Sequence, residues 1–206
     1  MEAAIECLAA SGYSATSTSD IAQQAGMTRA AMLYHFPSRM ALMEAAIHYL
    51  TRKRVEMYGE AMGKIPHDDR YFDRAIDTAW EQLQSSEFAA FAELSQAART
   101  DAQLSAVVSP ALAEYDRARR AWALRLFPPG ESAKPWFDLR RDIVRFLSEG
   151  LAELGELSFD TERRKLQVLE FLKVLCTEPE SGTLMQKAID RARGRKSGGR
   201  TGKTTD

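Results

Sequence analysis

The sequence lacks any run of apolar residues long enough to span a membrane as a helix. Cysteine is scarce, since Cys7 and Cys176 are the only two in 206 residues, and each lies within an apolar helical pattern in an opposite half of the chain. That placement favours buried free thiols over a disulfide or a metal site. The missing membrane span and the unpaired thiols together predict a protein of the reducing cytoplasm.

Motifs of common enzyme classes are missing as well. The sequence has no Gly-rich dinucleotide turn, no GxSxG elbow and no HExxH motif, and its three histidines lack the spacing of metal ligands. The fragment SGGRTGKT near the end of the chain is a poor match to a phosphate-binding loop, because Ser197 replaces the first glycine and no strand precedes it. We therefore expect no catalytic residue, no metal and no cofactor.

An excess of positive charge is also absent, since 28 Lys and Arg residues face 29 Asp and Glu residues and the formal net charge is −1. The first fifty residues contain the cations Arg29 and Arg39 against the acids Glu2, Glu6, Asp20 and Glu44. Many DNA-binding domains are plainly basic. Any DNA binding by this chain must therefore depend on a few well-placed contacts, doubled in a dimer, rather than on a broad positive field.

What the sequence has in abundance is helical periodicity. No segment shows a period-two run of β-branched residues, and most prolines fall between apolar stripes. The patterns predict an all-α fold with helices over about 38–63, 69–84, 86–99, 101–127, 135–154 and 161–177. We expect the helix over 101–127 to be bent or broken at Ser109-Pro110. The basic stretch 191–206 has no apolar residue beyond one alanine, so we expect it to be disordered.

The segment over residues 16–39, TSTSDIAQQAGMTRAAMLYHFPSR, predicts two short helices joined by a tight turn. Ser17 or Thr18 can cap the first helix, and Gly26 suits the left-handed residue that ends it. Thr28 can cap the second helix, which stops at the next proline. This is the layout of a helix-turn-helix, whose second helix lies in the major groove of DNA.

This segment resembles the DNA-binding domain of the tetracycline-repressor (TetR) family. The resemblance covers roughly the first fifty residues and follows the run GYSATSTSDIAQQAGMTRAAMLYHFPSRMALMEAAI. The matching positions are Gly12-Tyr13, the Thr/Ser cluster, Asp20-Ile21-Ala22, Ala25-Gly26, Arg29, Tyr34-His35-Phe36 and Pro37-Ser38-Arg39. The resemblance implies a homodimeric transcriptional regulator, usually a repressor, that a small ligand releases from DNA.

The resemblance also implies roles for single residues. Thr18 and Thr28 match hydroxyls that touch phosphates or base edges, and Arg29 matches the basic head of the recognition helix. Tyr34 and His35 match residues that lie against the DNA backbone, and Arg39 matches a phosphate clamp. The predicted DNA-binding residues are Ser17, Thr18, Thr28, Arg29, Ala30, Tyr34, His35 and Arg39. Each also has a plainer interpretation, in which the hydroxyls are helix caps and the aromatic residues are surface or packing residues.

Two residues depart from the family pattern. Ala30 stands where the family mostly has glycine, and its methyl group either narrows the approach to a base or touches a thymine methyl. Leu33 stands where the family often has a tyrosine that contacts phosphate, which puts one backbone contact in doubt.

Three parts of the chain are predicted. Residues 1–50 form the helix-turn-helix domain, with the motif itself at about 17–36; residues 51–178 form a larger helical ligand-binding and dimerisation domain; and residues 179–206 form a basic disordered tail. Wide apolar faces over about 135–177 predict a homodimer through these helices, as the last two long helices make in the TetR family. The alternative is that both helices are buried within one subunit.

Aromatic residues of the second part predict an apolar cavity for an unknown small-molecule ligand, although aromatic residues at helical spacing are more often core. The predicted lining residues are Trp80, Phe88, Phe91, Trp122 and Trp136. Taken together, the sequence predicts a transcriptional regulator that binds an inverted repeat in double-stranded DNA. A helical ligand-binding or interaction module with a decayed DNA-binding segment is the alternative, and an all-helical enzyme is the competing class.

Overall fold

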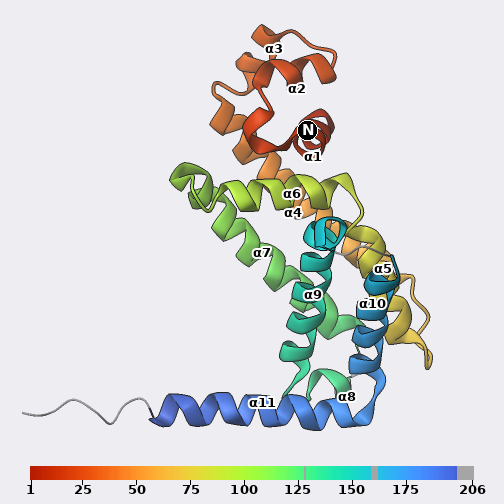
Figure 1. The fold of residues 1–206 in the computed structure, drawn as a ribbon. Coiled ribbons are helices and arrows are strands. Elements are labelled where there is room, and N and C mark those ends of the chain that lie inside the picture. The colour runs from red at the N-terminus through yellow and green to blue at the C-terminus, as the bar shows by residue number, and fades with distance from the viewer. Residues whose placement is uncertain (128, 159–161, 199–206) are drawn as a thin grey trace, which may run out of the picture. The chain divides into compact units, whose positions relative to one another are not determined.

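The computed structural model describes residues 1–127, 129–158 and 162–198, and every regular element within these ranges is a helix (Figure 1). The helices are α1 (Glu2–Ala15), α2 (Thr18–Gln24), α3 (Arg29–His35), α4 (Arg39–Gly63), α5 (Tyr71–Gln82), α6 (Ser86–Ala97), α7 (Ala102–Leu126), α8 (Pro129–Ser132), α9 (Phe137–Ser158), α10 (Glu162–Thr177) and α11 (Pro179–Gly198). The predicted all-α fold is confirmed. Among the described residues, no helix is long and apolar enough to cross a lipid bilayer.

The chain forms two compact units. Met1–Pro66 and Asp77–Leu126 make the first unit, which contains α1 to α4 with α6 and α7. His67–Ile76 and the chain from Phe127 onward make the second unit, which contains α8 to α11. Helix α5 begins in the second unit and ends in the first. This grouping by compactness does not test the functional boundaries at residues 50 and 178, which stay predictions.

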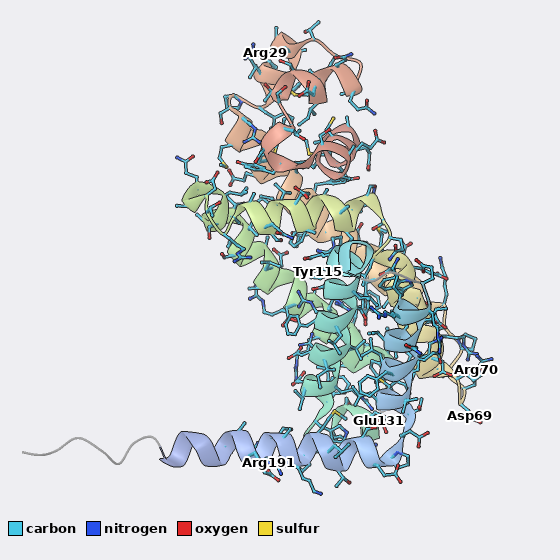
Figure 2. All side chains as sticks on the ribbon, in the orientation of Figure 1. Arg29, Asp69, Arg70, Tyr115, Glu131 and Arg191 are labelled. Atoms are coloured by element: carbon cyan, nitrogen blue, oxygen red, sulfur yellow. The ribbon has the colours of Figure 1, made fainter. Side chains whose placement is uncertain are left out.

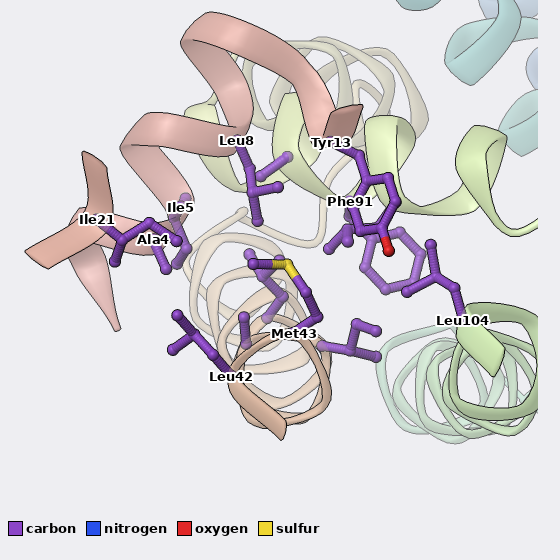
Figure 3. Packing of buried hydrophobic residues seen from close by; sticks show 14 of the residues in the cluster. Ala4, Ile5, Leu8, Tyr13, Ile21, Leu42, Met43, Phe91 and Leu104 are labelled. Carbon is purple, nitrogen blue, oxygen red and sulfur yellow. The ribbon is translucent and has the colours of Figure 1, made fainter. Parts of the chain in front are cut away.

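A continuous apolar core holds the first unit together (Figure 3). Helix α1 packs along α6, and α4 packs along α7. Their fully buried side chains include Ile5, Leu8, Leu42, Met43, Ile47, Leu50, Leu94, Leu104 and Val108. These positions recur at helical spacing, so burial of one face of each helix accounts for its stability. The first three helices are thereby fixed to α4 and α6 in one packed body.

The second unit has a cluster of aromatic rings packed around Phe127. The ring of Phe127 lies 5.3 Å from that of Phe72, 5.5 Å from that of Tyr71 and 5.7 Å from that of Phe137, measured between ring centres. Edge-to-face and offset pairs at these separations add to the stabilisation from burial. Helix α10 packs on both α9 and α11. This aromatic cluster fixes the start of α5 to the start of α9.

Helix α7 is unbroken through Pro110, so a break at Ser109-Pro110 is wrong. Proline removes one backbone donor and crowds the preceding turn. Pro110 is exposed, whereas its neighbours Val108 and Ala111 are buried. The packing of this apolar face on α4 keeps the helix continuous.

The predicted disordered tail over 179–206 is wrong for Pro179–Gly198, which form α11; residues 199–206 lie outside the described residues. Pro179 occupies the first helical position, where proline is favoured. Ser181 and Met185 are buried, and Gln186 donates a hydrogen bond of 2.9 Å to Asp190 one turn later. The prediction failed because composition was judged from Arg191 onward, beyond the turns whose burial anchors the helix.

Candidate nucleic-acid interface

A reciprocal pair of hydrogen bonds begins α2. The Ser17 hydroxyl accepts from the backbone N–H of Asp20 at 3.2 Å, and the Asp20 carboxylate accepts from the backbone N–H of Ser17 at 2.9 Å. This capping box satisfies two backbone donors at the helix start. The hydroxyl and backbone hydrogen bonds from Ser17 lower the pKa of the Asp20 carboxyl. Ser17 therefore has a structural role, and Thr18 occupies the first helical position beside it, half-buried.

The turn between α2 and α3 is built around Gly26. Its φ is +66°, in the left-handed region that glycine adopts most readily. The N–H of Gly26 donates to the Gln23 carbonyl at 3.0 Å, and the N–H of Met27 donates to the Ala22 carbonyl at 3.0 Å. These two bonds form a Schellman motif, which closes the end of α2. The turn predicted from the sequence therefore has a defined geometry that sets the direction of α3.

Helix α3 is held from beneath and open on its outer face. The Thr28 hydroxyl caps it by accepting from the N–H of Ala31 at 3.1 Å, and Met32 is its buried anchor. The exposed residues of its outer face are Arg29, Ala30, Ala31, Tyr34 and His35. Among the described residues, no side chain pairs with the Arg29 guanidinium (Figure 2). A short helix anchored by one side chain and exposed elsewhere has the form of a recognition helix.

Tyr34 is the most exposed large hydrophobic side chain of this face, with 86% of its surface open to solvent. Its ring meets the His35 ring edge to face at 5.3 Å. A tyrosine left this open carries apolar surface and a hydroxyl that other side chains of the protein do not cover. Both residues are thus available to lie against a partner surface, as predicted for the DNA backbone.

Arg39 lies at the start of α4, half-buried and engaged with α1. Its Nε donates to the Thr16 carbonyl at 3.2 Å, its Nη2 donates to the Tyr13 carbonyl, and its guanidinium lies 4.1 Å from the centre of the Tyr13 ring. Sequence reasoning identified Arg39 only as a phosphate clamp and missed this positioning role. The role in binding phosphate stays a prediction, and it would use donors of the guanidinium other than these two.

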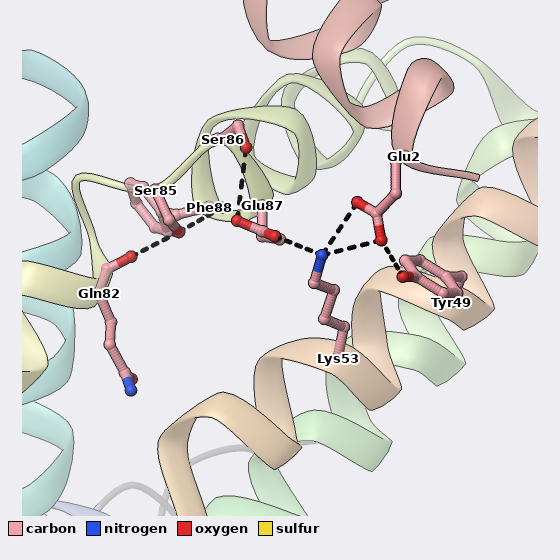
Figure 4. Close-up of polar contacts among 8 residues, drawn as sticks. All are labelled: Glu2, Tyr49, Lys53, Gln82, Ser85, Ser86, Glu87 and Phe88. Carbon is pink, nitrogen blue, oxygen red and sulfur yellow. Dashed lines mark hydrogen bonds and ion pairs between the residues drawn. The ribbon is translucent and has the colours of Figure 1, made fainter. Parts of the chain in front are cut away.

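Sequence reasoning also missed a polar cluster that joins α1, α4 and α6 (Figure 4). The Lys53 ammonium lies 2.9 Å from the Glu2 carboxylate and 2.7 Å from the Glu87 carboxylate, and the Tyr49 hydroxyl donates to Glu2. Lys53 is therefore an internal link of the first unit rather than a cation on a solvated helix face. Only the spacing of Tyr49 and Lys53 on one helix face hinted at the contact, because Glu2 and Glu87 are remote in sequence.

The five aromatic residues predicted to line a ligand cavity lie in different settings. Phe88 and Phe91 are buried on α6, where the buried guanidinium of Arg54 lies 5.5 Å and 4.5 Å from their ring centres. The ring of Trp122 packs against Gly59, and Trp80 is half-buried on α5.

Trp136 belongs to the second unit, unlike these four residues, and lines a cavity there. That all five aromatic residues bind one ligand stays a prediction. Within the described ranges, no group of His, Cys, Asp or Glu side chains is placed to hold a metal ion.

Comparison with known proteins identifies the N-terminal segment. Residues 1–46 match the family model of bacterial regulatory proteins of the tetR family. An uncharacterized helix-turn-helix transcriptional regulator of Mycobacterium tuberculosis is 28% identical over 132 residues, which is 64% of this chain and 67% of that protein. The helix-turn-helix transcriptional regulator CymR of Pseudomonas putida is 28% identical over 102 residues, half of each chain.

Solved structures agree with these matches. The fold resembles that of a proposed transcriptional regulator from Streptomyces coelicolor A3(2), with a TM-score of 0.56, 25% identity, and coverage of 86% of this chain and 95% of the other. A proposed transcriptional regulator from Pseudomonas aeruginosa PAO1 shares the fold with a TM-score of 0.59 at 19% identity, covering 87% and 89% of the two chains. Members of the family are transcriptional regulators rather than enzymes. Residues 1–46 thus form a DNA-binding domain of the TetR type, and the chain, which is similar to TetR-family regulators, is a DNA-binding transcriptional regulator.

Proposed function

We propose that the protein is a repressor that binds an inverted-repeat operator and is released from it by a small ligand. The outer face of α3 carries this proposal, because Arg29 and Tyr34 are exposed there on a helix whose start and anchor are fixed. An exposed arginine at the N-terminal end of a recognition helix suits contact with a guanine edge in the major groove. Such a regulator acts where the chromosome lies, which places it in the cytoplasm.

The remaining predicted DNA contacts divide into two kinds. Thr18, Thr28, Tyr34 and His35 lie at helix starts or on the exposed face of α3, where side chains reach phosphates and set orientation. The exposed methyl group of Ala30 suits contact with a thymine methyl. Specificity therefore rests on the first turn of α3, and affinity rests on the contacts around it.

TetR-family regulators typically form dimers, and we infer that α9 and α10 carry the contact between subunits. Large apolar side chains are exposed on both helices, namely Phe146, Leu147, Leu166, Phe171 and Val174. Leu147, Val168 and Phe171 also line a groove between the two helices, together with Arg164 and Gln167. A contiguous apolar surface of this kind marks an interface, and a second copy of the same surface matches it by two-fold symmetry.

A two-fold dimer accounts for the proposed operator and its control. It presents two recognition helices about one turn of DNA apart, roughly 34–36 Å, so the two half-sites form an inverted repeat. A ligand that binds better to a subunit conformation with the wrong spacing lowers DNA affinity by linkage. Helix α4 reaches from the α1–α3 core to α7 and is the natural element to transmit such a change.

Selection of random duplex DNA on the purified protein tests the proposal. We expect an enriched inverted repeat, bound by two subunits, with a binding constant that falls as salt is raised. Selected and scrambled duplexes are compared at one salt concentration, because phosphate contacts alone give salt-sensitive binding to both. Equal binding to the two duplexes would contradict sequence-specific binding to an operator.

A further inference from the structure

The second unit contains a cavity of about 290 Å³. Its walls come from the residues before and within the start of α5, from α8 and the loop after it, from α9, and from the junction of α10 and α11. The volume is close to the lower limit of small-molecule sites in proteins. All of the lining residues belong to this one unit, so the cavity is defined by its packing alone.

The most deeply buried charged group at this cavity is positive. Arg140 is buried there; its guanidinium donates to the Glu131 carboxylate at 3.2 Å and to the Cys176 carbonyl at 3.5 Å. Lys134 donates to the same carboxylate at 2.5 Å. Burial by itself raises the pKa of Glu131, but the hydrogen bonds and charges of Lys134 and Arg140 together outweigh it and hold the pKa below its usual value. Arg140, which is buried, and Lys134, whose side chain is 39% exposed, thus share one ionised carboxylate in the cavity wall.

Ser181 supplies a free polar group in the wall. Only 7% of the residue is exposed, it lines the cavity, and no described residue forms a hydrogen bond with its hydroxyl. It lies in the first turn of the 20-residue helix α11, whose N-terminal end attracts negative charge. The Ser181 hydroxyl can therefore form a hydrogen bond with a ligand or a water molecule in the cavity.

The acidic groups near the cavity oppose an anion, but solvent reaches them. Asp73 does not line the cavity, yet its charge adds to burial in raising the pKa of Cys176, and its side chain is 30% exposed. Burial raises the pKa of the Cys176 thiol to about 11, so the thiol is neutral at physiological pH. The remaining acidic groups of the lining, Asp69 and Glu178, are exposed to solvent, which screens their charge. The interior of the cavity therefore favours a negative group more than its rim does.

A flat apolar wall faces the same space. The ring of Trp136 lies so close to Gly182 that a Cβ atom on this glycine would be 2.6 Å from the ring. Phe72 adds a second ring to the lining. An indole fixed against a helix backbone presents a flat surface on which a ligand ring can stack.

From these features we propose that the cavity binds a small aromatic carboxylate. The carboxylate accepts hydrogen bonds from Arg140 and Ser181 beside the start of α11, and the aromatic ring packs against Trp136. This site deepens the proposed function by naming the chemical class of the releasing ligand, and to that extent it rests on the proposed function. Ligand binding to the cavity, however, can be measured in the absence of DNA.

Calorimetric titration of the full chain with three matched probes tests the site. The probes are naphthoate, the neutral naphthalenemethanol and the cationic naphthylmethylammonium, which share one ring system. We expect naphthoate to bind, the alcohol to bind about tenfold more weakly, and the ammonium compound to bind least. Failure of naphthoate to bind, or a preference for the ammonium compound through Asp69 and Glu178, overturns the proposal.

Two single-hydroxyl variants localise the binding. Ser181→Ala removes a hydroxyl that has no partner among the described residues, so we expect unchanged thermal stability and about tenfold weaker naphthoate binding, with the alcohol less affected. Thr183→Ala removes an exposed hydroxyl of the same helix that does not line the cavity, and we expect no change. Equal effects of the two variants contradict the site. If the protein selects an operator but does not bind naphthoate, the proposed repressor function stands and the proposed ligand class is wrong.

Discussion

The guanidinium of Arg39 lies 4.1 Å from the centre of the Tyr13 ring and also donates to the Tyr13 backbone carbonyl. A further bond of 3.2 Å reaches the Thr16 carbonyl. The last turn of α1 contains no basic residue of its own. Arg39 therefore supplies, from the start of α4, the positive charge that the carbonyl end of a helix favours.

We predict that Arg39→Ala lowers both the stability of the first unit and the affinity for DNA. The variant loses two hydrogen bonds to backbone carbonyls and one cation–π contact, so the free energy of unfolding should fall by about 1–3 kcal/mol. Thermal unfolding measures the loss, and affinity should weaken similarly for operator and random DNA. Arg52→Ala is the matched control because Arg52 is exposed on the same helix, and its thermal stability should remain that of the parent.

Arg29→Ala should change specificity without changing stability. The side chain is exposed and has no partner among the described residues, so its removal costs no contact within the protein. If Arg29 contacts a guanine edge, its loss should cost about 1–3 kcal/mol of discrimination at one base pair of each half-site. Competition between the selected operator and single-base variants measures this. A uniform loss across all duplexes would instead assign Arg29 to a phosphate.

Gly26→Ala isolates the backbone conformation of the turn. A Cβ atom there meets nothing within 4 Å, so the expected loss of about 1 kcal/mol comes from the φ of +66° alone. Gly63→Ala is the control, because Gly63 ends α4 with equally open surroundings and no positive φ. We expect Gly63→Ala to leave the melting temperature unchanged or raised. Equal destabilisation by the two variants would contradict the assigned role of Gly26.

The features that local chemistry determines were predictable from the sequence. The Ser17 and Thr28 caps and the Gly26 turn each depend on residues within five positions of one another. Their side chains satisfy backbone groups of the same segment, so residue type and spacing suffice to place them. The helix-turn-helix was identifiable for that reason, and its comparison with known families agrees.

The features that depend on distant residues were not predictable. Arg39 contacts Tyr13 across 26 positions, and Lys53 contacts Glu2 across 51, so no short pattern contains either pair. The same limit applies to α11, which is stabilised by burial of Ser181 and Met185 rather than by its composition. A sequence pattern identifies the exposed and buried faces of a helix, but not the residue that a charged side chain will meet.

Lys53→Met should reduce stability most at neutral pH. Hydrogen bonds from Tyr49 and Lys53 lower the pKa of Glu2. Burial raises the pKa of Glu87, but the hydrogen bond and charge of Lys53, together with bonds from its own backbone and Ser86, outweigh burial and leave the pKa below the ordinary 4.5. Because these carboxyls bind protons less readily in the folded state, their stabilisation is present above about pH 4.5 and is lost as the pH falls through the lowered values. The difference in melting temperature between variant and parent should therefore shrink towards about pH 3.

Lys64→Met is the control for this pH dependence. Lys64 is exposed just after α4, so its replacement removes the same charge without breaking the cluster of Glu2, Tyr49, Lys53 and Glu87. We expect its melting temperature to follow that of the parent at every pH. If the difference in melting temperature between Lys53→Met and the parent stays constant from neutral to acidic pH, lost packing rather than lost ion pairs explains the effect of the variant.

Phe171→Glu should convert a dimer into monomers. Phe171 is 57% exposed on α10 and lines the groove beside Leu147 and Val168. A glutamate there would bury a carboxylate in the proposed interface, where Arg164 of the same groove offsets only part of the cost of removing the charge from water; in the isolated subunit the carboxylate faces water. Light scattering measures the molecular mass. The control Leu124→Glu changes a residue of α7 outside this surface and should leave the mass unchanged.

Because a monomer presents only one recognition helix, the Phe171 variant should also lose its preference for an inverted repeat over a single half-site. A Phe171 variant that remains dimeric would exclude the α9–α10 surface as the interface.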